Sequence, residues 1–388
     1  MSHSNEPNNK TLAIIGGGAA GFFLAINVKE LMPELDVTIF EQQKKVLAKV
    51  EISGGGRCNC TNTFAEVTDL KQVYPRGAQL LKRLFKQFGP ADAYQWFERH
   101  GVPLTVQEDQ CVFPAAQDSH AIIDCFLRET KRLGIHLQLG TKIEDAEALL
   151  QQFDDVAVTI GGTPQKDGCV PSLFTFTIPD QGLTALQGLV VPNALVGIPA
   201  TSFRSQGALL ITHWGLSGPA ILKLSSYAAR HLAEQKYQSP LRISWTGEND
   251  AEAVRLHITY ILEQNAQRLI DHAKPYGLQT RLWTYLLSKV GLQGKRCNEL
   301  GKKGLNRLVE LLTNDTYTIA GRSPYKDEFV TCGGIPLDEV DKQTLESKHT
   351  PHLFYAGEVL DIDGVTGGFN FQAAWTTAYA VAKGITKK

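Results

Sequence analysis

The chain has 388 residues, which is long enough for two or three domains and for a large core that needs no disulfide or metal support. Lys and Arg number 39 and Asp and Glu 40, so the formal net charge is −1. This balance disfavours a nucleic-acid binder that depends on bulk positive charge, although it allows a local basic patch. There is no 18-residue apolar run and no apolar N-terminal segment, and the seven cysteines lack framework spacing. We therefore expect a reduced, cytoplasmic protein without a membrane-spanning helix.

The beginning of the chain has the pattern of a β-α-β unit. Residues 12–15 form a short apolar run that is typical of a buried parallel strand, and the glycine-rich residues 16–21 follow it. Residues 22–31 then have a helical pattern, and residues 37–40 are β-branched and apolar, with Glu41 at the end of this second strand. The order strand, glycine turn, helix and strand within about thirty residues predicts a nucleotide-binding unit.

The glycine turn fits the pattern G-x-G-x-x-G, in which each glycine has a separate task. The first allows a tight turn, the second lets the backbone approach a pyrophosphate, and the third lets the helix pack on the strand. The residues that we expect to contact the phosphates are Gly16, Gly18, Ala19, Ala20 and Gly21. Glu41 lies twenty residues after Gly21, where a carboxylate binds a ribose 2′-OH and repels the 2′-phosphate of NADP. The alternative is an ordinary turn.

The rest of the chain is punctuated by Gly and Pro into further elements. Residues 251–313 are rich in Leu and poor in β-branched pairs, which predicts a small helical subdomain. The other elements that the apolar spacing predicts are helices over 78–100 and 119–133, strands over 173–178 and 208–212, and near the C-terminus a strand over 353–356, a glycine-rich loop and a helix over 371–383.

The C-terminal glycine loop favours FAD over NAD as the ligand. A chain that wraps FAD must return to the nucleotide domain to reach the flavin, whereas an NAD dehydrogenase needs no second ligand loop. A helix that begins near Gly368 would point its positive end at the flavin N1–C2=O edge, where negative charge collects on reduction. No second G-x-G-x-x-G unit is present, so we expect NAD(P)H to act as a transient reductant. The alternative is an ordinary strand and helix.

Four segments resemble a known family: SGGGRCNCTN at 53–62, THWGLSGP at 212–219, TCGGI at 331–335, and YAGE through GGFNFQ at 355–372. In these segments the chain is similar to the bacterial BaiN-like flavoproteins, also described as aminoacetone-oxidase-type FAD-binding proteins. The resemblance implies tightly held, non-covalent FAD. It also implies reduction of electron-poor C=C bonds, which in this family has been linked to bile-acid-type enones and to a uracil of ribosomal RNA.

The resemblance also implies an α/β architecture of three parts. A Rossmann-like FAD-binding domain would be built from both chain ends, residues 11–170 and 331–388. A β-barrel-like domain, residues 171–250 and 314–330, would be inserted in it, with residues 251–313 as a helical insert. One segment departs from the family pattern, because only the eight residues 163–170 separate Gly162 from the following PSLF strand. Residues 142–153 also look short and helical where two strands are expected. We therefore expect one wall of the active site to be missing or rebuilt.

The motif at 53–60 contains several candidate flavin ligands. Glycines 54–56 let backbone N–H groups approach a flat ring or a phosphate, and Arg57 adds a cation. The alternative for Arg57 is a solvated surface turn. Lys49 would stabilise anionic reduced flavin or remain a surface lysine. Cys58 is a candidate proton donor; a redox disulfide with Cys60 and a buried small residue are the alternatives.

A C-x-C pair without further ligands is a poor zinc site, so no metal is expected. We predict His213 as the second catalytic residue, because a reductase needs a proton donor near neutral pH. The alternative is that His213 bonds a turn carbonyl. Asn62 is a further candidate for a hydrogen bond to flavin or substrate. Beside the phosphate loop and Glu41, the predicted cofactor-binding residues are Lys49, Ser53, Gly54, Gly55, Gly56, Arg57, Asn59, Gly161, Gly357, Glu358, Asp361, Gly367, Gly368, Phe369, Asn370 and Phe371.

Residues 295–307 are locally basic, with five cations in thirteen residues. Such a helical insert would contact ribosomal RNA, or it would be a solvated helix face. The sequence thus predicts an FAD-dependent oxidoreductase that reduces an electron-poor C=C bond of a small molecule or a nucleobase. The alternatives are an rRNA dihydrouridine-forming flavoenzyme and a non-catalytic FAD-binding scaffold. The oligomeric state is left open.

Overall fold

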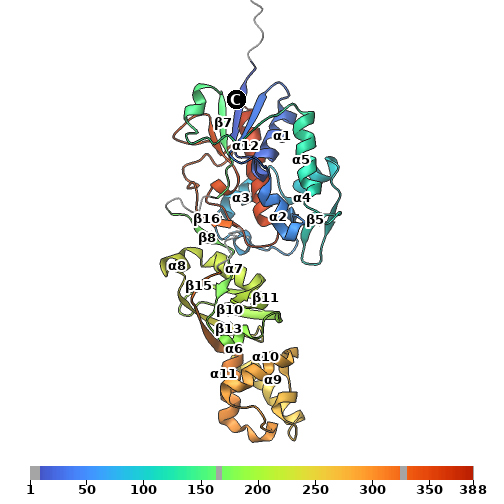
Figure 1. The fold of residues 1–388 in the computed structure, drawn as a ribbon, viewed down its shortest axis with the longest axis vertical. Coiled ribbons are helices and arrows are strands. Elements are labelled where there is room, and N and C mark those ends of the chain that lie inside the picture. Colours follow the sequence, from blue (N-terminus) through green and yellow to red (C-terminus); the bar gives the residue numbers. More distant parts are fainter. Residues whose placement is uncertain (1–8, 163–167, 324–329, 388) are drawn as a thin grey trace, which may run out of the picture. The chain divides into compact units, whose positions relative to one another are not determined.

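The computed structural model describes residues 9–162, 168–323 and 330–387 (Figure 1). The chain divides into two compact units. Unit 1 comprises Met1–Val170 and Val330–Lys388, so both ends of the chain contribute to it, and unit 2 comprises Pro171–Phe329. The short strands β8 (Val170–Ser172) and β16 (Val330–Cys332) lie where the chain passes from one unit to the other.

Unit 1 is built on a five-stranded parallel sheet with the strand order β17-β7-β1-β2-β6. Its strands are β1 (Thr11–Ile15), β2 (Asp36–Glu41), β6 (His136–Leu139), β7 (Asp155–Val158) and β17 (Leu353–Tyr355). The predicted β-α-β unit is confirmed, because the apolar run at 12–15 forms the central strand and is buried. In such sheets ligands bind beyond the carboxyl ends of the strands.

Helices cover this sheet, and α1 (Ala19–Leu31) packs against α12 (Phe369–Ile385), as Figure 1 shows. Phe23 of α1 lies with its ring centroid 4.6 Å from that of Trp96 and 5.1 Å from that of Trp375. This aromatic core joins helices from both chain ends. The other helical segments of unit 1 are α2 (Ala48–Gly56), α3 (Ala78–Leu84), α4 (Pro90–Arg99), α5 (His120–Arg132) and the 3₁₀ turns η1 (Leu70–Gln72), η2 (Ala148–Gln151) and η6 (Gly357–Val359).

The prediction of one helix over 78–100 is wrong, because α3 and α4 are separate helices. Pro90 is the first residue of α4, where its missing N–H and fixed φ suit a helix start. The Asp92 carboxylate accepts a hydrogen bond from the Gly89 N–H at 2.7 Å and fixes the new start. Beside these helices lies a small antiparallel sheet of β3 (Thr61–Asn62), β5 (Cys111–Pro114) and β4 (Leu104–Val106).

Unit 2 contains a seven-stranded antiparallel sheet in the order β14-β13-β10-β11-β12-β9-β15. Residues 315–322 pair with β13 at one end of their length and with β9 at the other, and the Ala320 N–H donates to the Thr177 carbonyl at 2.9 Å. One strand segment therefore joins both edges of the sheet, which gives the expected barrel-like closure. The strands are β9 (Phe176–Thr177), β10 (Val190–Gly197), β11 (Arg204–Thr212), β12 (Gly215–Ser217), β13 (Ser239–Ser244), β14 (Asp315–Ile319) and β15 (Gly321–Arg322).

The predicted strand over 173–178 is shorter than expected, since only the two residues of β9 pair in the sheet. The predicted strand over 208–212 lies within β11. The helices beside this sheet are α6 (Gln181–Thr184), α7 (Pro219–Tyr227) and α8 (Ala229–Glu234).

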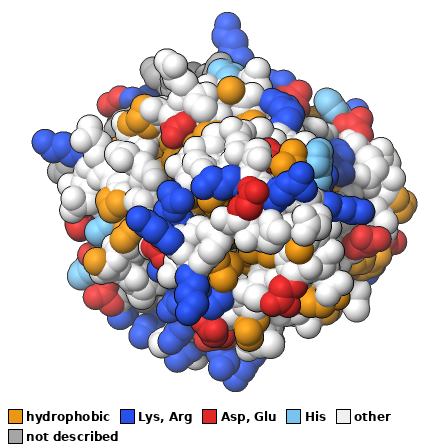
Figure 2. Space-filling view, turned by 90° about the horizontal axis from the view of Figure 1, so that it is seen from below, with side chains coloured by type: hydrophobic (Ala, Val, Ile, Leu, Met, Phe, Trp, Pro, Cys, Tyr) orange, Lys and Arg blue, Asp and Glu red, His pale blue; other side chains and the backbone are white. Residues whose placement is uncertain are grey.

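Residues 251–314 form the helical end of unit 2. Its elements are α9 (Ala251–Gln264), α10 (Thr280–Val290), α11 (Gly301–Asn314) and the 3₁₀ turns η3 (Ile270–His272), η4 (Pro275–Gly277) and η5 (Cys297–Glu299). Leu282, Trp283 and Leu312 are buried in the core of unit 2. Figure 2 shows Lys and Arg side chains gathered on the face seen from the end where Figure 1 draws these helices. Within the part of the chain that the structure describes, no helix combines the length and apolarity needed to cross a bilayer.

Candidate functional site

Four predicted ligand residues follow four neighbouring strands of the parallel sheet in unit 1. Gly16 follows β1, Glu41 ends β2, Gly161 comes shortly after β7 and Gly357 comes shortly after β17. Because the strands are parallel, these residues share one edge of the sheet. All the other predicted cofactor-binding residues also belong to unit 1.

The glycines of the first loop have the geometry that their predicted tasks require. Gly16 has φ +115°, and a Cβ there would lie 2.6 Å from the Thr159 carbonyl oxygen. A Cβ on Gly21 would lie 2.1 Å from the Gly16 oxygen, so helix and strand pack together only with glycine at this position. Gly18 has open space around its Cβ position, as a phosphate-contacting backbone needs.

Thr159, which the sequence analysis missed, holds this loop from the neighbouring strand. Its hydroxyl lies 3.0 Å from the Ile15 oxygen and 2.9 Å from the Gly16 oxygen, and it donates to these carbonyls. Its position directly after β7, beside the glycine loop, is the signal that would have found it. The N-terminus of α1 has no acidic residue and no side-chain cap. The N–H groups of Ala19 and Ala20 have no hydrogen-bond partner among the described residues, so they are available to an anion.

Glu41 accepts hydrogen bonds from the backbone of two segments, the glycine loop and the residues that follow β2. Its Oε2 accepts a hydrogen bond from the Gly17 N–H at 2.8 Å, and its Oε1 accepts one from the Gln43 N–H at 2.8 Å. Each carboxylate oxygen can accept a second hydrogen bond, so the side chain retains capacity for a ribose hydroxyl. The carboxylate therefore shapes the glycine loop in addition to its predicted ligand role.

The N-terminus of α12 is a second uncapped helix end. Gly368 precedes the helix with φ +85°, and the first turn contains no acidic residue. A Cβ on Gly368 would lie 2.2 Å from the Thr61 carbonyl oxygen, which explains the glycine. The Asn62 side-chain NH₂ donates to the Gly367 carbonyl at 3.1 Å. With its amide oxygen turned toward Gly368, Asn59 accepts the N–H of that residue at 3.2 Å.

The loop before α12 is held by Asn370 and by other groups that the sequence analysis did not identify. Arg76 forms a two-pronged ion pair with the fully buried Asp363. The Tyr74 hydroxyl donates to the Phe369 carbonyl at 2.8 Å. Asn370 accepts from the Gly364 N–H at 2.8 Å and donates back to the Gly364 carbonyl at 2.9 Å. The predicted ligands Asn59, Asn62 and Asn370 thus all bond the protein backbone around this helix end.

The glycines at 54–56 form a left-handed turn, with φ of +57°, +69° and +83°. The Cβ positions of Gly55 and Gly56 face open space, as a close approach to a ligand requires. The Arg57 guanidinium lies 4.3 Å from the centre of the Phe113 ring. It also donates to the Gly54 carbonyl at 3.2 Å and to the Gln117 side chain at 3.3 Å. Arg57 is therefore fixed on the glycine turn itself.

Lys49 and Glu358 form an ion pair, with Nζ and Oε2 3.0 Å apart. The other oxygen of Glu358 accepts the Thr331 N–H at 2.7 Å, and a Cβ on Gly161 would lie 3.5 Å from Oε2. This pair links three segments at the predicted cofactor edge. The positive charge of Lys49 is already balanced by a carboxylate.

Cys58 and Cys60 are free thiols and are fully buried. Burial raises the pKa of the Cys58 thiol to about 12, and burial also raises that of Cys60 well above its usual range. A thiol with this pKa is a weak acid, so the environment of Cys58 resembles that of a small core residue.

His213 lies in unit 2, in the turn between β11 and β12, and its side chain is exposed. Its ring meets that of Trp214 edge to face, with the centroids 4.6 Å apart. The Trp214 indole N–H donates to the Thr175 hydroxyl at 3.2 Å. The ring of the predicted catalytic histidine thus packs against Trp214 and is accessible to solvent.

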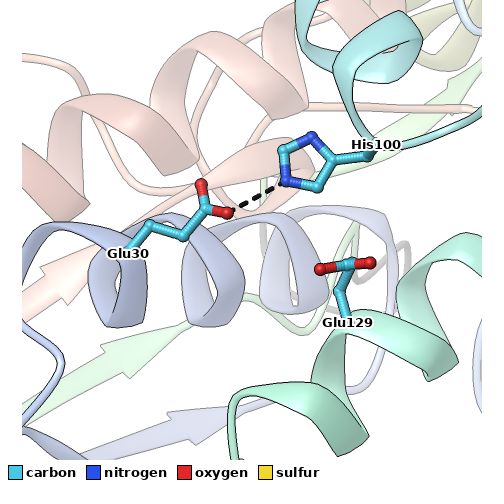
Figure 3. A group of neighbouring side chains, drawn as sticks. All are labelled: Glu30, His100 and Glu129. Atoms are coloured by element: carbon cyan, nitrogen blue, oxygen red, sulfur yellow. Dashed lines mark hydrogen bonds and ion pairs between the residues drawn. The ribbon is translucent and has the colours of Figure 1, made fainter.

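A cluster of charged residues elsewhere in unit 1 brings Glu30, His100 and Glu129 together (Figure 3). His100 Nε2 lies 3.0 Å from a Glu30 oxygen. Arg128 and Arg132 bind the Glu129 carboxylate at 3.2 and 2.5 Å. The two arginines balance the charge of the carboxylates, so we interpret this group as an ion-pair network that ties α1, α4 and α5 together.

Comparisons with known proteins identify the family of this chain. The model of the HI0933-like protein Rossmann domain family matches residues 10–384. A ribosomal RNA dihydrouridine synthase of Haemophilus influenzae is 27% identical, over 97% of this chain and 98% of that protein. A 3-dehydro-bile acid delta(4,6)-reductase of Clostridium scindens is 24% identical, over 97% of this chain and 99% of that protein.

A second ribosomal RNA dihydrouridine synthase, from Escherichia coli, is 26% identical, over 95% of this chain and 96% of that protein. The similarity in all three cases extends over nearly the full length of both chains. The family model likewise spans almost the whole chain. The resemblance found in the sequence motifs is thereby confirmed, and the chain belongs to the HI0933-like family of Rossmann-domain proteins.

Proposed function

We propose that this protein is an FAD-dependent oxidoreductase that reduces an electron-poor C=C bond with electrons from NAD(P)H. The observation that carries the proposal is that the helix N-termini of α1 and α12, each preceded by a glycine-rich loop in unit 1, have no side-chain cap and no acidic residue in the first turn. FAD has two regions that favour such ends, the pyrophosphate and the flavin N1–C2=O edge. A nicotinamide dinucleotide alone would use only the first.

The residues of unit 1 fit FAD. The backbone around Gly18 is open to a pyrophosphate, and Glu41 has capacity left for the adenosine ribose. The N-terminus of α12 and the turn at 54–56 would hold the flavin, with Asp363 and its partner fixing the loop before α12. When bound, the flavin supplies hydride transfer chemistry.

The relatives support the reaction class. A dihydrouridine synthase and a delta(4,6)-reductase act on different molecules, yet both names describe saturation of a carbon–carbon double bond. In such a reaction one carbon receives a hydride and the adjacent carbon or its carbonyl must be protonated or stabilised. The protein has to supply or direct that proton.

We propose His213 as the proton donor. An imidazole changes its protonation state near neutral pH, and the exposed ring of His213 can exchange protons with water. Cys58 is the less favourable candidate, because burial holds the pKa of its thiol at about 12. A positioned acid is worth about 10²–10⁴-fold in rate.

The first test of this proposal is the identity and reactivity of the cofactor. Purified protein should be yellow, should release FAD and not FMN on denaturation, and should lose its absorbance near 450 nm when NADH or NADPH is added without oxygen. Release of FMN, or absence of any flavin after reconstitution, would contradict the cofactor assignment. Bound FAD that neither nicotinamide reduces would instead favour the non-catalytic scaffold.

The second test separates the two half-reactions in a His213→Asn variant by stopped-flow absorbance. Flavin reduction should match that of the unaltered protein, whereas reoxidation by an enone acceptor should be about 10²–10⁴-fold slower. Asparagine retains hydrogen bonding but provides no acid near neutral pH. Equal reoxidation rates with a saturating acceptor would assign His213 a structural role.

A uracil of ribosomal RNA is the specific substrate that two of the relatives favour, because both are named as rRNA dihydrouridine synthases. Mass spectrometry of ribosomal RNA from a deletion strain should then show the loss of a dihydrouridine. A plasmid copy of the gene should restore it, whereas a copy with Gly21→Ala, which closes the space between helix and strand, should not. An unchanged dihydrouridine content would direct the search to small-molecule enones.

A further inference from the structure

We propose that unit 2 binds RNA through a basic surface formed by Arg268, Lys295, Lys302, Lys303 and Arg307. This inference rests on the proposed function with a uracil of RNA as the substrate. It concerns a partner-binding surface at the helical end of unit 2 and assigns these residues no part in the chemistry. They would contact phosphates and hold the RNA in place.

The fold brings these cations together from separate parts of the chain. The Ile270 N–H donates to the Lys295 carbonyl at 2.9 Å, and the Cys297 N–H donates to the Arg268 carbonyl at 3.0 Å. Arg268 and Lys295 therefore lie on two paired segments. The single 3₁₀ turn Cys297–Glu299 then leads into α11.

Helix α11 presents its polar residues on one side and its apolar residues on the other. Leu308 and Leu312 are buried, whereas Lys302, Lys303 and Arg307 are exposed. These positions fall within the first two turns of the helix, so they extend the group that begins at Arg268 and Lys295. Three of the five cations therefore lie on the exposed side of α11, and the other two lie on the paired segments that precede it across η5.

These five side chains have no carboxylate partner among the described residues, in contrast to Arg255 and Lys289 of the same region. Arg255 lies 3.1 Å from a Glu252 oxygen, and Lys289 lies 2.5 Å from an Asp315 oxygen. Residues 251–314 contain ten Lys and Arg and five Asp and Glu, although the whole chain has a net charge of −1.

Helix stability does not account for the positions of Lys302 and Lys303. Both lie in the first turn of α11, which contains no acidic residue, and the helix dipole disfavours cations at this end. Lys303 and Arg307 are also four residues apart, where two like charges repel each other. A bound polyanion relieves both effects.

The chemistry of the surface favours structured RNA over a membrane. An amphipathic helix that binds a lipid surface combines cations with apolar side chains that enter the bilayer. The other exposed positions of α11 are Gly301, Asn306, Glu310 and Asn314, none of which has an apolar side chain that could enter a bilayer. Residues 295–307 contain no aromatic side chain for stacking on unpaired bases, so phosphate contacts to folded RNA fit best.

The test is filter binding of unmodified, in vitro transcribed ribosomal RNA of the same organism to the full-length protein. The variant is Lys302→Glu/Lys303→Glu/Arg307→Glu. The matched control is Lys82→Glu/Arg83→Glu/Lys86→Glu, which makes the same charge change at exposed positions of unit 1. A third variant, Lys302→Arg/Lys303→Arg/Arg307→Lys, keeps the charge.

Affinity of the α11 variant at about 0.1 M salt should fall at least about tenfold, and the slope of log affinity against log salt should shrink by about 2–3. The unit 1 control and the charge-keeping variant should stay within about threefold of the unaltered protein. Retained affinity in the α11 variant, an equal loss in the control, or equally tight binding of duplex DNA of similar length would overturn the proposal.

Two readouts keep this result separate from the proposed function. The α11 variant should be at least as stable as the unaltered protein in thermal unfolding, because acidic residues suit the first turn of a helix. NADH-driven flavin reduction should be unchanged, because the substituted residues are exposed and belong to unit 2. The unaltered protein could lack flavin reduction or dihydrouridine formation while its RNA binding still depends on these three cations. That result would contradict the proposed function and would support the RNA-binding surface.

Discussion

Replacement of Glu41 by Gln tests the part of the site that the sequence and the structure describe in most detail. In the folded protein each carboxylate oxygen accepts one backbone N–H, from Gly17 on one side and Gln43 on the other, both at 2.8 Å. Glutamine has nearly the same shape, but it offers one acceptor oxygen and one NH₂ group. One of the two backbone N–H groups must then face the NH₂ group of the glutamine, which is itself a donor.

The size of the effect follows from these two bonds. Hydrogen bonds to a charged acceptor contribute about 1.5–3 kcal/mol each, and the surviving bond becomes a neutral one worth about 1 kcal/mol. We expect the free energy of unfolding of the cofactor-free protein to fall by about 2–5 kcal/mol. If Glu41 also binds the ribose, the FAD dissociation constant should rise by a further factor of about ten or more.

Urea denaturation of the cofactor-free protein measures the first quantity, and titration with FAD measures the second. Asp36→Asn is the matched control, because Asp36 starts the same strand, is exposed and has no side-chain hydrogen bond among the described residues. An unfolding free energy within about 0.5 kcal/mol of the unaltered protein would refute the role of Glu41 in shaping the loop. Unchanged FAD affinity with reduced stability would confine Glu41 to a structural role.

Three further predictions concern other parts of unit 1. Gly21→Ala places a Cβ 2.1 Å from a backbone oxygen and should destabilise the protein by about 3 kcal/mol or more, measured by thermal unfolding. Asp363→Asn leaves Arg76 without its buried partner and should cost about 3–5 kcal/mol in urea, whereas Arg76→Met/Asp363→Leu should regain most of this loss. The Cys58 thiol has a pKa of about 12, so about one part in ten thousand is thiolate at pH 8. Mass spectrometry should therefore find Cys58 unmodified by iodoacetamide after the half-buried Cys169 has reacted. Equal rates of modification at the two cysteines would contradict the burial of Cys58.

The elements that the sequence predicted well are those whose signals are local. The run at 12–15, the glycine loop and Glu41 lie within about thirty residues, and each follows from backbone sterics or strand periodicity. The prediction of a single helix over 78–100 was wrong for a related reason. Apolar spacing continues across Gly89 and Pro90, and only the capping bond of Asp92 shows that a new helix begins.

The contacts that the sequence did not predict join residues far apart in the chain. Arg76 and Asp363 are separated by 287 positions, and Lys49 and Glu358 by 309. Periodicity carries no information about such pairs, because they depend on how β17 and α12 return to the sheet. For the same reason, the sequence identified Asn370 as a residue that can donate and accept hydrogen bonds. It did not predict that both of these bonds are made with the Gly364 backbone. Residues 163–167 of the shortened segment lie outside the described residues.

The origin of unit 1 from both ends of the chain has a consequence for its folding during synthesis. Strand β17 forms the edge of the parallel sheet, and α12 supplies Trp375 to the aromatic core around Phe23. Until these residues have left the ribosome, the first 170 residues expose an unpaired sheet edge and an uncovered apolar face. At about 5–20 residues per second, the intervening residues 171–329 alone take about 8–30 s to make. During that interval the nascent N-terminal segment is a natural client for a chaperone that shields apolar surface.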